Sequence, residues 1–304
     1  MEQEKKIYLK GLTIAIIGIV VLSFDALLIR MSDASGVAAV FYRAFFTFIS
    51  ISIIFFLKNR KKSLSIIYSG GYPMIISGIM WGISGTGFTL GVHYAGAANT
   101  LVLVTLAPLF AAAFSAIFYK RKPSLVTVIA AIIALFGIWY MYREGFGDMD
   151  LLGLFYALLT PLFLGSNLAF MRKHKEMSRM SLVIIGGITG SVIALVLSKG
   201  NIAIANESIL PLAILGLVVI PFSQTMISTG TRYISAADAA LVNSSETVLG
   251  IFYVWLFLGE IPNKDFLIGG SLVVLAITAN SVYQSHMRNR KISPEMDSTN
   301  QVQG

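Results

Sequence analysis

The chain has 304 residues, of which 56% are hydrophobic and only 12% are charged, and its mean hydropathy is +0.78. This balance excludes an ordinary soluble domain and indicates a membrane protein. The formal net charge of +8 comes from lysines and arginines that lie between apolar stretches, which argues against a nucleic-acid partner. The chain contains no cysteine, so it has no disulfide framework and no thiolate metal site.

Ten apolar stretches are long enough to cross a bilayer core of about 30 Å, which needs roughly 20 residues of helix. In chain order they lie at about 8–29, 35–57, 71–92, 96–118, 125–142, 150–171, 180–198, 208–228, 233–258 and 266–285. Their apolar runs are continuous, whereas the strands of a membrane barrel alternate in polarity, so we predict helices. The first stretch has no small-residue cleavage site and is expected to be a span, not a signal peptide. The prediction is an all-α polytopic membrane protein.

The basic residues between the stretches predict an orientation. With a cytoplasmic amino terminus and ten spans, 18 lysines and arginines lie on the cytoplasmic side and four on the other. Positive residues are retained in the cytoplasm during insertion, so we predict ten helices in the cell (inner or plasma) membrane with both termini cytoplasmic. The four outer residues are Arg30, Arg143, Lys199 and Lys264.

An internal repeat relates the two halves of the chain at a constant separation of 139 positions. Gly91, Tyr94, Ala97, Ala98, Phe118 and Pro123 match Gly230, Tyr233, Ala236, Ala237, Phe257 and Pro262. We expect a five-helix repeat at 8–142, a second at 150–285, and a short cytoplasmic tail at 286–304. Because five is odd, the second repeat must be inverted across the membrane. Inverted repeats are typical of secondary transporters.

The repeated residues also carry a family resemblance. Tyr94–Asn99 followed by Ala107–Phe110 resembles the fourth helix of the EamA-domain branch of the drug/metabolite transporter superfamily. The second-half partner is Tyr233–Asp238, followed by Glu246-Thr247-Val248 and Phe257–Glu260, and Phe41-Tyr42-Arg43 resembles the family's second helix. Thr247 stands where the family often has proline, so a kink is expected near Pro108 but is in doubt at Thr247.

This resemblance covers roughly residues 10–285. It implies a secondary transporter that moves small metabolites such as amino acids, sugar conjugates or organic cations, frequently outward. The substrate would bind between helices 1–4 and 6–9. Helices 5 and 10 would pack at the periphery, where they could support a homodimer.

Glu246 is the first candidate for a transport pathway. Ionisable groups inside a membrane are costly unless they are paired or face water, so they are functional candidates by default. Glu246 lies near the middle of the ninth stretch, with Asn243 one turn before it and Gly250 one turn after it. Residues three and four apart share a helical face, which suits the lining of a cavity. The alternative is a carboxylate that only bonds a group on a neighbouring helix.

Asp25 and Arg43 lie at comparable depths in adjacent antiparallel stretches, so an ion pair between them is feasible. The pair could attract substrate or act as an outer gate. It could equally clamp two helices, or Arg43 could extend towards the headgroups.

Two further candidates are Trp81 and Ser223. Trp81 lies midway through a glycine-rich stretch, where an indole could stack on an aromatic or cationic ligand, although core packing is the common role of such a ring. Ser223 adds hydrogen-bonding capacity, although membrane serines often satisfy a neighbouring backbone group.

The sequence shows no enzyme constellation. The three histidines are scattered, and no glycine-rich phosphate loop is present. We therefore expect no enzymatic activity, no cofactor and no metal, with a small-molecule substrate and membrane lipid as the partners. Two alternatives to a carrier stay open. One is a flippase for a lipid-linked metabolite, and the other is a non-transporting, receptor-like membrane protein.

Overall fold

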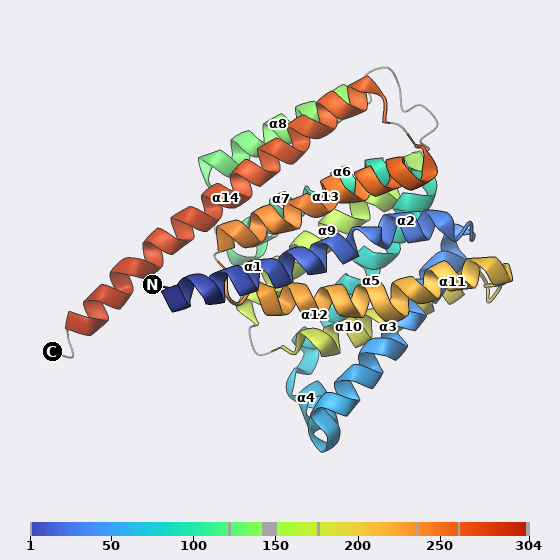
Figure 1. The fold of residues 1–304 in the computed structure, drawn as a ribbon, viewed down its shortest axis with the longest axis horizontal. Helices are drawn as coiled ribbons and strands as arrows, with labels where there is room; N and C mark the ends of the chain where they lie inside the picture. Colours follow the sequence, from blue (N-terminus) through green and yellow to red (C-terminus); the bar gives the residue numbers. More distant parts are fainter. Residues whose placement is uncertain are drawn as a thin grey trace.

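The computed structural model describes residues 2–120, 123–141, 151–174, 177–234, 236–260 and 262–301, and in these ranges the chain is helical, with no strand (Figure 1). The prediction of an all-α membrane protein is confirmed. The elements are α1 (Glu2–Leu22), α2 (Phe24–Met31), α3 (Gly36–Asn59), η1 (Arg60–Lys62), α4 (Ser63–Ser69), α5 (Gly71–Tyr94), α6 (Ala97–Val104), α7 (Ala107–Tyr119), α8 (Leu125–Met141), α9 (Leu151–Lys173), α10 (Arg179–Leu197), α11 (Asn206–Ile214), η2 (Leu215–Val219), α12 (Ile220–Gly230), α13 (Ala236–Leu258) and α14 (Lys264–Gln301).

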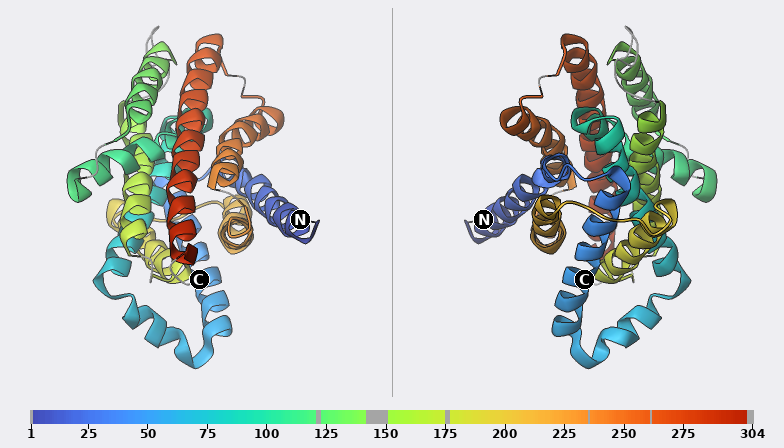
Figure 2. Two further views of the ribbon diagram at one scale, coloured as in Figure 1. Left: turned by 90° about the vertical axis from the view of Figure 1, so that its left-hand side faces the viewer. Right: turned by 90° about the vertical axis from the view of Figure 1, so that its right-hand side faces the viewer.

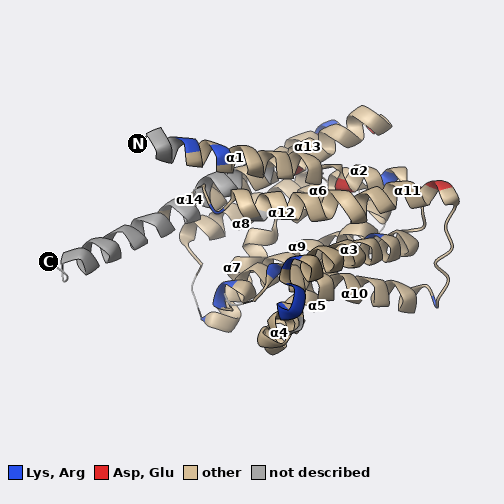
Figure 3. Ribbon diagram, turned by 60° about the horizontal axis from the view of Figure 1, so that its bottom comes forward, with Lys and Arg blue, Asp and Glu red and all other residues tan. Residues whose placement is uncertain are grey.

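Each of the ten predicted apolar stretches coincides with a helix or a broken helix. In the described ranges, seven helices are long and apolar enough to cross a membrane, and the bent pair α6–α7 makes an eighth. The other two stretches correspond to α8 and to the apolar part of α13, Ser245–Leu258, which are shorter. The count of ten spans therefore stays a prediction. Figure 3 shows lysines and arginines gathered around η1 and at the end of α7, whereas the helix middles are mostly uncharged.

In the described residues one span is broken by a sharp bend, and a proline accounts for it. α6 ends at Val104 and α7 begins at Ala107, with Pro108 in its first turn and a bend of 41° between the two. Proline has no N–H to donate, so the helical ladder is interrupted there. Thr247 occupies the matching position in α13, keeps its N–H, and α13 runs through it unbroken. The expected kink at Pro108 is thus confirmed and the doubtful one at Thr247 is absent.

Two irregularities were not expected from the sequence. The first span, Lys6–Met31, has a slight irregularity at Ser23, a turn residue with helical backbone angles that separates α1 from α2. The eighth contains a π-helical segment, η2, immediately before Pro221 in the first turn of α12. π-Helical turns are frequent at functional sites. The wider turn also fits the proline that follows it, because proline has no N–H and cannot donate the regular helical hydrogen bond.

The helices of the two halves pack in related pairs. α5 lies along α9, and its counterpart α12 lies along α1. α10 packs on α5, and in the equivalent pair of the other half α3 packs on η2 and α11. Two further pairs, α3 with α10 and α8 with α14, each consist of a helix and its own counterpart in the other half. Figures 1 and 2 show α8 and α14 side by side at one edge of the bundle. They cross closely because Gly137 and Gly269 meet, and a methyl group on Gly269 would collide with the Gly137 carbonyl.

Candidate functional site

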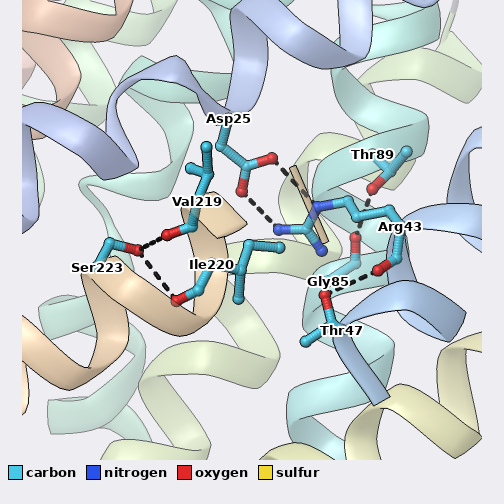
Figure 4. A network of polar contacts seen from close by, with 8 residues as sticks. All are labelled: Asp25, Arg43, Thr47, Gly85, Thr89, Val219, Ile220 and Ser223. Carbon is cyan, nitrogen blue, oxygen red and sulfur yellow. Dashed lines mark hydrogen bonds and ion pairs between the residues drawn. The ribbon is translucent and has the colours of Figure 1, made fainter. Parts of the chain in front are cut away.

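A buried ion pair joins α2 to α3. Arg43 donates from Nη2 to Asp25 Oδ2 at 2.5 Å and from Nε to Asp25 Oδ1 at 3.1 Å (Figure 4). Asp25 is 5% exposed and Arg43 is 9% exposed. A buried charge is expensive without a partner, and the two-point contact between guanidinium and carboxylate is the geometry that best compensates it. The ion pair that the sequence made feasible is present.

The irregularity at Ser23 lies next to the carboxylate. Asp25 falls in the first turn of α2, which begins immediately after Ser23. A helix start favours a negative side chain, and because Ser23 keeps helical backbone angles the effect on Asp25 is that of a slight irregularity within one span. The Ser23 hydroxyl donates to the carbonyl of Ile19 at 2.8 Å, so it satisfies the end of α1 without capping α2.

Glu246 of α13 approaches the same irregularity. Its backbone oxygen lies 3.5 Å from Ser23 Oγ, two residues before Asp25, so Glu246 lies in the same region of the bundle as the ion pair. The side chain is half-buried, and within the described part of the chain its carboxylate has no hydrogen bond or ion pair. The three charged groups form a polar cluster with one excess negative charge when all of them are ionised. We call Asp25, Arg43 and Glu246 the charge cluster.

Trp81 of α5 lies near Arg43. Both residues line a small cavity of about 10 Å³ between α3, α5 and α10, which is roughly the space of one water molecule. The Trp81 ring packs directly on Gly186 of α10, where a methyl group would collide with it. The other lining residues are Val40, Ala44, Thr47, Gly82, Gly85, Thr86, Thr89 and Gly190.

The structure places the other two candidates differently. Ser223 is fully buried in α12, and its hydroxyl is within hydrogen-bonding distance of the carbonyls of Val219 (2.6 Å) and Ile220 (3.1 Å) of its own helix (Figure 4). That geometry favours a role in its own helix. Asn243 is exposed on α13, one turn before Glu246. Neither residue has a hydrogen bond to Asp25 or Arg43.

The cavity lining includes residues that the sequence reasoning left out of the candidate site. Gly82 and Thr86 are four residues apart on α5, as are Gly186 and Gly190 on α10. Such stripes of small residues are the available signal, but they indicate close helix packing and do not by themselves indicate a cavity.

Two contacts close opposite ends of the bundle. Arg30, near the end of α2, donates to Glu260 Oε1 from Nη2 at 2.6 Å, just beyond the end of α13. At the other end, Lys173 of α9 lies with its Nζ 5.0 Å from the centre of the Tyr119 ring of α7. We call these contacts the Arg30 clasp and the Lys173 clasp.

Comparison with known proteins identifies the family. The model of the EamA-like transporter family matches residues 9–143 and again residues 151–282. The chain belongs to the EamA-like transporter family. The resemblance that the sequence showed is confirmed, and this EamA-like protein is an integral membrane protein of a transporter family that carries the repeat twice.

Individual relatives agree with this assignment. The EamA-like chain is 26% identical over 180 residues to an "Uncharacterized transporter YdfC" of Bacillus subtilis (strain 168). That alignment covers 57% of this chain and 58% of the relative. A solved structure described only as "Crystal structure of protein" has a TM-score of 0.62 at 16% identity, covering 91% of this chain and 99% of the other. This last likeness supports the fold.

Proposed function

We propose that this EamA-like protein is a secondary transporter that exports small metabolites, such as amino acids or related organic compounds, across the cell membrane by alternating access. The observation that carries the proposal is the charge cluster. Charged groups within spans mark substrate or ion pathways, because the cost of burying them is otherwise hard to offset. Asp25 and Arg43 compensate each other, whereas Glu246 has no bonded partner in the described part of the chain.

The position of the cluster supports a pathway. Asp25 lies next to the slight irregularity within its span, and the Glu246 backbone approaches the same irregularity. Secondary transporters place substrate and coupling ions near the membrane midplane, at the interface between their repeats. Glu246 could therefore exchange a proton for substrate or hold the amine of a substrate.

The pairing of helices supports two related repeats, 8–142 and 150–285, with the second inverted. The packing pairs map onto each other when the halves are exchanged, yet the halves differ in detail. The fourth span bends by 41° between α6 and α7, whereas its counterpart α13 is continuous. Alternating access requires two repeats that can exchange unequal conformations.

We assign the two clasps as the contacts that open and close alternately in such a cycle. The Arg30 clasp joins the first and ninth spans, and the Lys173 clasp joins their counterparts, the sixth and fourth, at the opposite end. Both are closed here, in keeping with a cavity the size of one water molecule. In the proposed orientation, opening the Arg30 clasp leads to the outside and opening the Lys173 clasp leads to the cytoplasm.

The test is flux in vesicles. The purified full chain is reconstituted, and efflux and uptake of a panel of amino acids and organic cations are followed with and without a pH gradient. We expect saturable flux of at least one compound class, and loss of that flux in Glu246→Ala but not in Glu207→Ala, an exposed carboxylate elsewhere. A folded protein that moves no compound faster than protein-free vesicles overturns the proposal, and movement of lipid-linked compounds alone indicates a flippase.

A further inference from the structure

The ion pair with Asp25 uses only some of the hydrogen-bond donors of Arg43. A guanidinium group carries five N–H donors in a planar fork. Asp25 accepts from Nε and from Nη2, and within the described part of the chain Nη1 makes no hydrogen bond. Arg43 is about nine-tenths buried as a residue, but Nη1 is not among the described side-chain atoms that are fully buried without a partner, so it keeps some accessible surface. Nη1 is therefore a donor that an incoming group can reach.

The unused nitrogen faces the small cavity. Arg43 lines that space together with Gly85, and a methyl group added to Gly85 would lie 3.2 Å from Nη1. Glycine at this position therefore keeps the approach to Nη1 open. Among the described residues that line the cavity, Arg43 carries the single charge, and Asp25 is not part of the lining.

The hydroxyl groups of the cavity are already committed as donors. Thr47 donates to the Arg43 carbonyl at 2.7 Å, Thr86 to the Gly82 carbonyl at 2.9 Å, and Thr89 to the Gly85 carbonyl at 3.0 Å. Each hydroxyl oxygen keeps the capacity to accept a hydrogen bond. A ligand thus meets a positive donor at Nη1, acceptors from the threonines, and the flat face or edge of Trp81.

We propose, on the basis of the transporter function above, that the free Nη1 edge of Arg43 binds the carboxylate of the substrate. Asp25 holds the opposite edge of the guanidinium and fixes its orientation. The substrate is then a carboxylate compound, with donor groups that reach the threonines and an apolar or aromatic part against Trp81. A cavity of about 10 Å³ does not hold a carboxylate, so binding widens the contact between α5 and α10.

Four compounds of similar shape distinguish the contribution of a carboxylate from that of an amine. Phenylalanine has both groups, 3-phenylpropanoate has only the carboxylate, and phenylalaninamide and phenethylamine have only the amine. Their binding to the purified full chain is measured by thermal stabilisation and by competition. We expect phenylalanine and 3-phenylpropanoate to bind, and the two probes without a carboxylate to bind more weakly by a factor on the order of ten to a hundred, as expected for loss of a charge-assisted hydrogen bond.

Gly85→Ala tests the residue assignment, because it crowds Nη1 without touching the atoms that contact Asp25. It is expected to weaken phenylalanine binding by about tenfold, the loss of roughly one such bond. Gly270→Ala on α14 is the matched control, since a methyl group there makes only ordinary contacts of 3.4 Å or more. Arg43→Lys keeps the charge but offers one nitrogen to both carboxylates, so it is expected to lose the preference for carboxylate probes as well.

Equal binding of phenylalanine and phenylalaninamide overturns the carboxylate site, as does an unchanged preference in a folded Gly85→Ala protein. Flux of phenethylamine or phenylalaninamide in the same vesicles separates the two proposals. If these compounds move without any carboxylate preference, the protein is a transporter and only the Arg43 assignment is wrong.

Discussion

Arg30 and Glu260 lie 230 positions apart and meet through one carboxylate oxygen, Glu260 Oε1, which accepts from both Nη2 and Nε of Arg30. The contact joins the ends of the first and ninth spans. The counterparts of those spans, the sixth and fourth, meet at the other end of the bundle through Lys173 and the Tyr119 ring. An ion pair in one case and a contact between a cation and an aromatic ring in the other therefore occupy related positions in the two halves. Each is weak enough to open within a transport cycle.

Glu260→Gln is predicted to raise access from the side that the Arg30 clasp closes. Exposed ion pairs contribute about 0.2–1 kcal/mol, so the open population should rise by at most about fivefold. The chain has no cysteine, so a single Thr89→Cys reporter in the cavity can be followed by its rate of modification with a membrane-impermeant thiol reagent. Glu207→Gln, an exposed carboxylate at the start of α11, is the control. Equal rates in both variants would contradict a clasp.

Tyr119→Leu is predicted to have the opposite effect on the same reporter. It removes the ring under Lys173, which is worth about 0.5–1 kcal/mol at an exposed site, and so favours opening at the other end. Modification of Thr89→Cys from the Arg30 side should slow by up to about fivefold, and modification from the Lys173 side should accelerate. Tyr119→Phe keeps the ring face and should behave as the parent. A Phe variant that behaves like the Leu variant would assign the effect to the lost hydroxyl.

The fold could be predicted from sequence because the membrane imposes one dominant rule. Spanning segments must satisfy their backbone internally, so continuous apolar runs of about 20 residues become helices. The kink at Pro108 could be predicted, because proline lacks an N–H. The irregularity at Ser23 could not be predicted, because nothing local in α1–α2 forbids a regular helix. The packing of α13 residues Glu246 and Gly250 against Ser23 is a property of the folded bundle.

The site was predicted in part for the same reason. Charges within spans are rare, so Asp25, Arg43 and Glu246 were visible in the sequence, and the spacing of the helices made the ion pair feasible. The cavity beside Arg43 was not visible, because glycine stripes on α5 and α10 predict close packing equally well. The orientation of Nη1 depends on which edge of the guanidinium Asp25 occupies. Only three-dimensional packing determines that choice.

Exchange of the buried pair tests its structural role. Asp25→Asn leaves Arg43 buried without a full partner, which is expected to cost about 3–5 kcal/mol of stability. The double variant Asp25→Arg with Arg43→Asp should regain part of the loss in melting temperature, less than all of it because a positive side chain at the start of α2 is unfavourable. If Arg43 also binds substrate, flux of carboxylate compounds should stay lost in the double variant. Recovery of both would make the pair a clamp or gate only.

The predicted topology can be tested by labelling single cysteines. Lys61→Cys in η1 should react only from the cytoplasm, and Asn201→Cys, between α10 and α11, only from outside, since both positions are exposed. Ser63 is a poorer labelling position because its side chain is buried, and Gly147, on the predicted outer side, lies outside the described residues. A tag on the carboxyl terminus should be cytoplasmic. An Asn201→Cys that reacts from the cytoplasm would overturn the ten-helix topology.

Glu246→Gln separates the remaining roles of the charge cluster. A carboxylate in a span without a bonded partner must bind either a proton or a cationic group when the site closes around it. Glutamine keeps the shape of the side chain and removes the exchangeable charge. We expect accumulation driven by a pH gradient to disappear in Glu246→Gln, while substrate binding and substrate–substrate exchange survive. Glu207→Gln should retain all three activities.

The contrary results are equally specific. If Glu246→Gln abolishes binding, and parent transport ignores the pH gradient, the carboxylate holds a substrate amine and carries no proton. In that case phenylalanine should lose affinity in the variant, whereas 3-phenylpropanoate, which has no amine, should keep it. If binding, exchange and accumulation all persist, Glu246 lies outside the pathway, and Asp25 and Arg43 are the charged groups that remain in it.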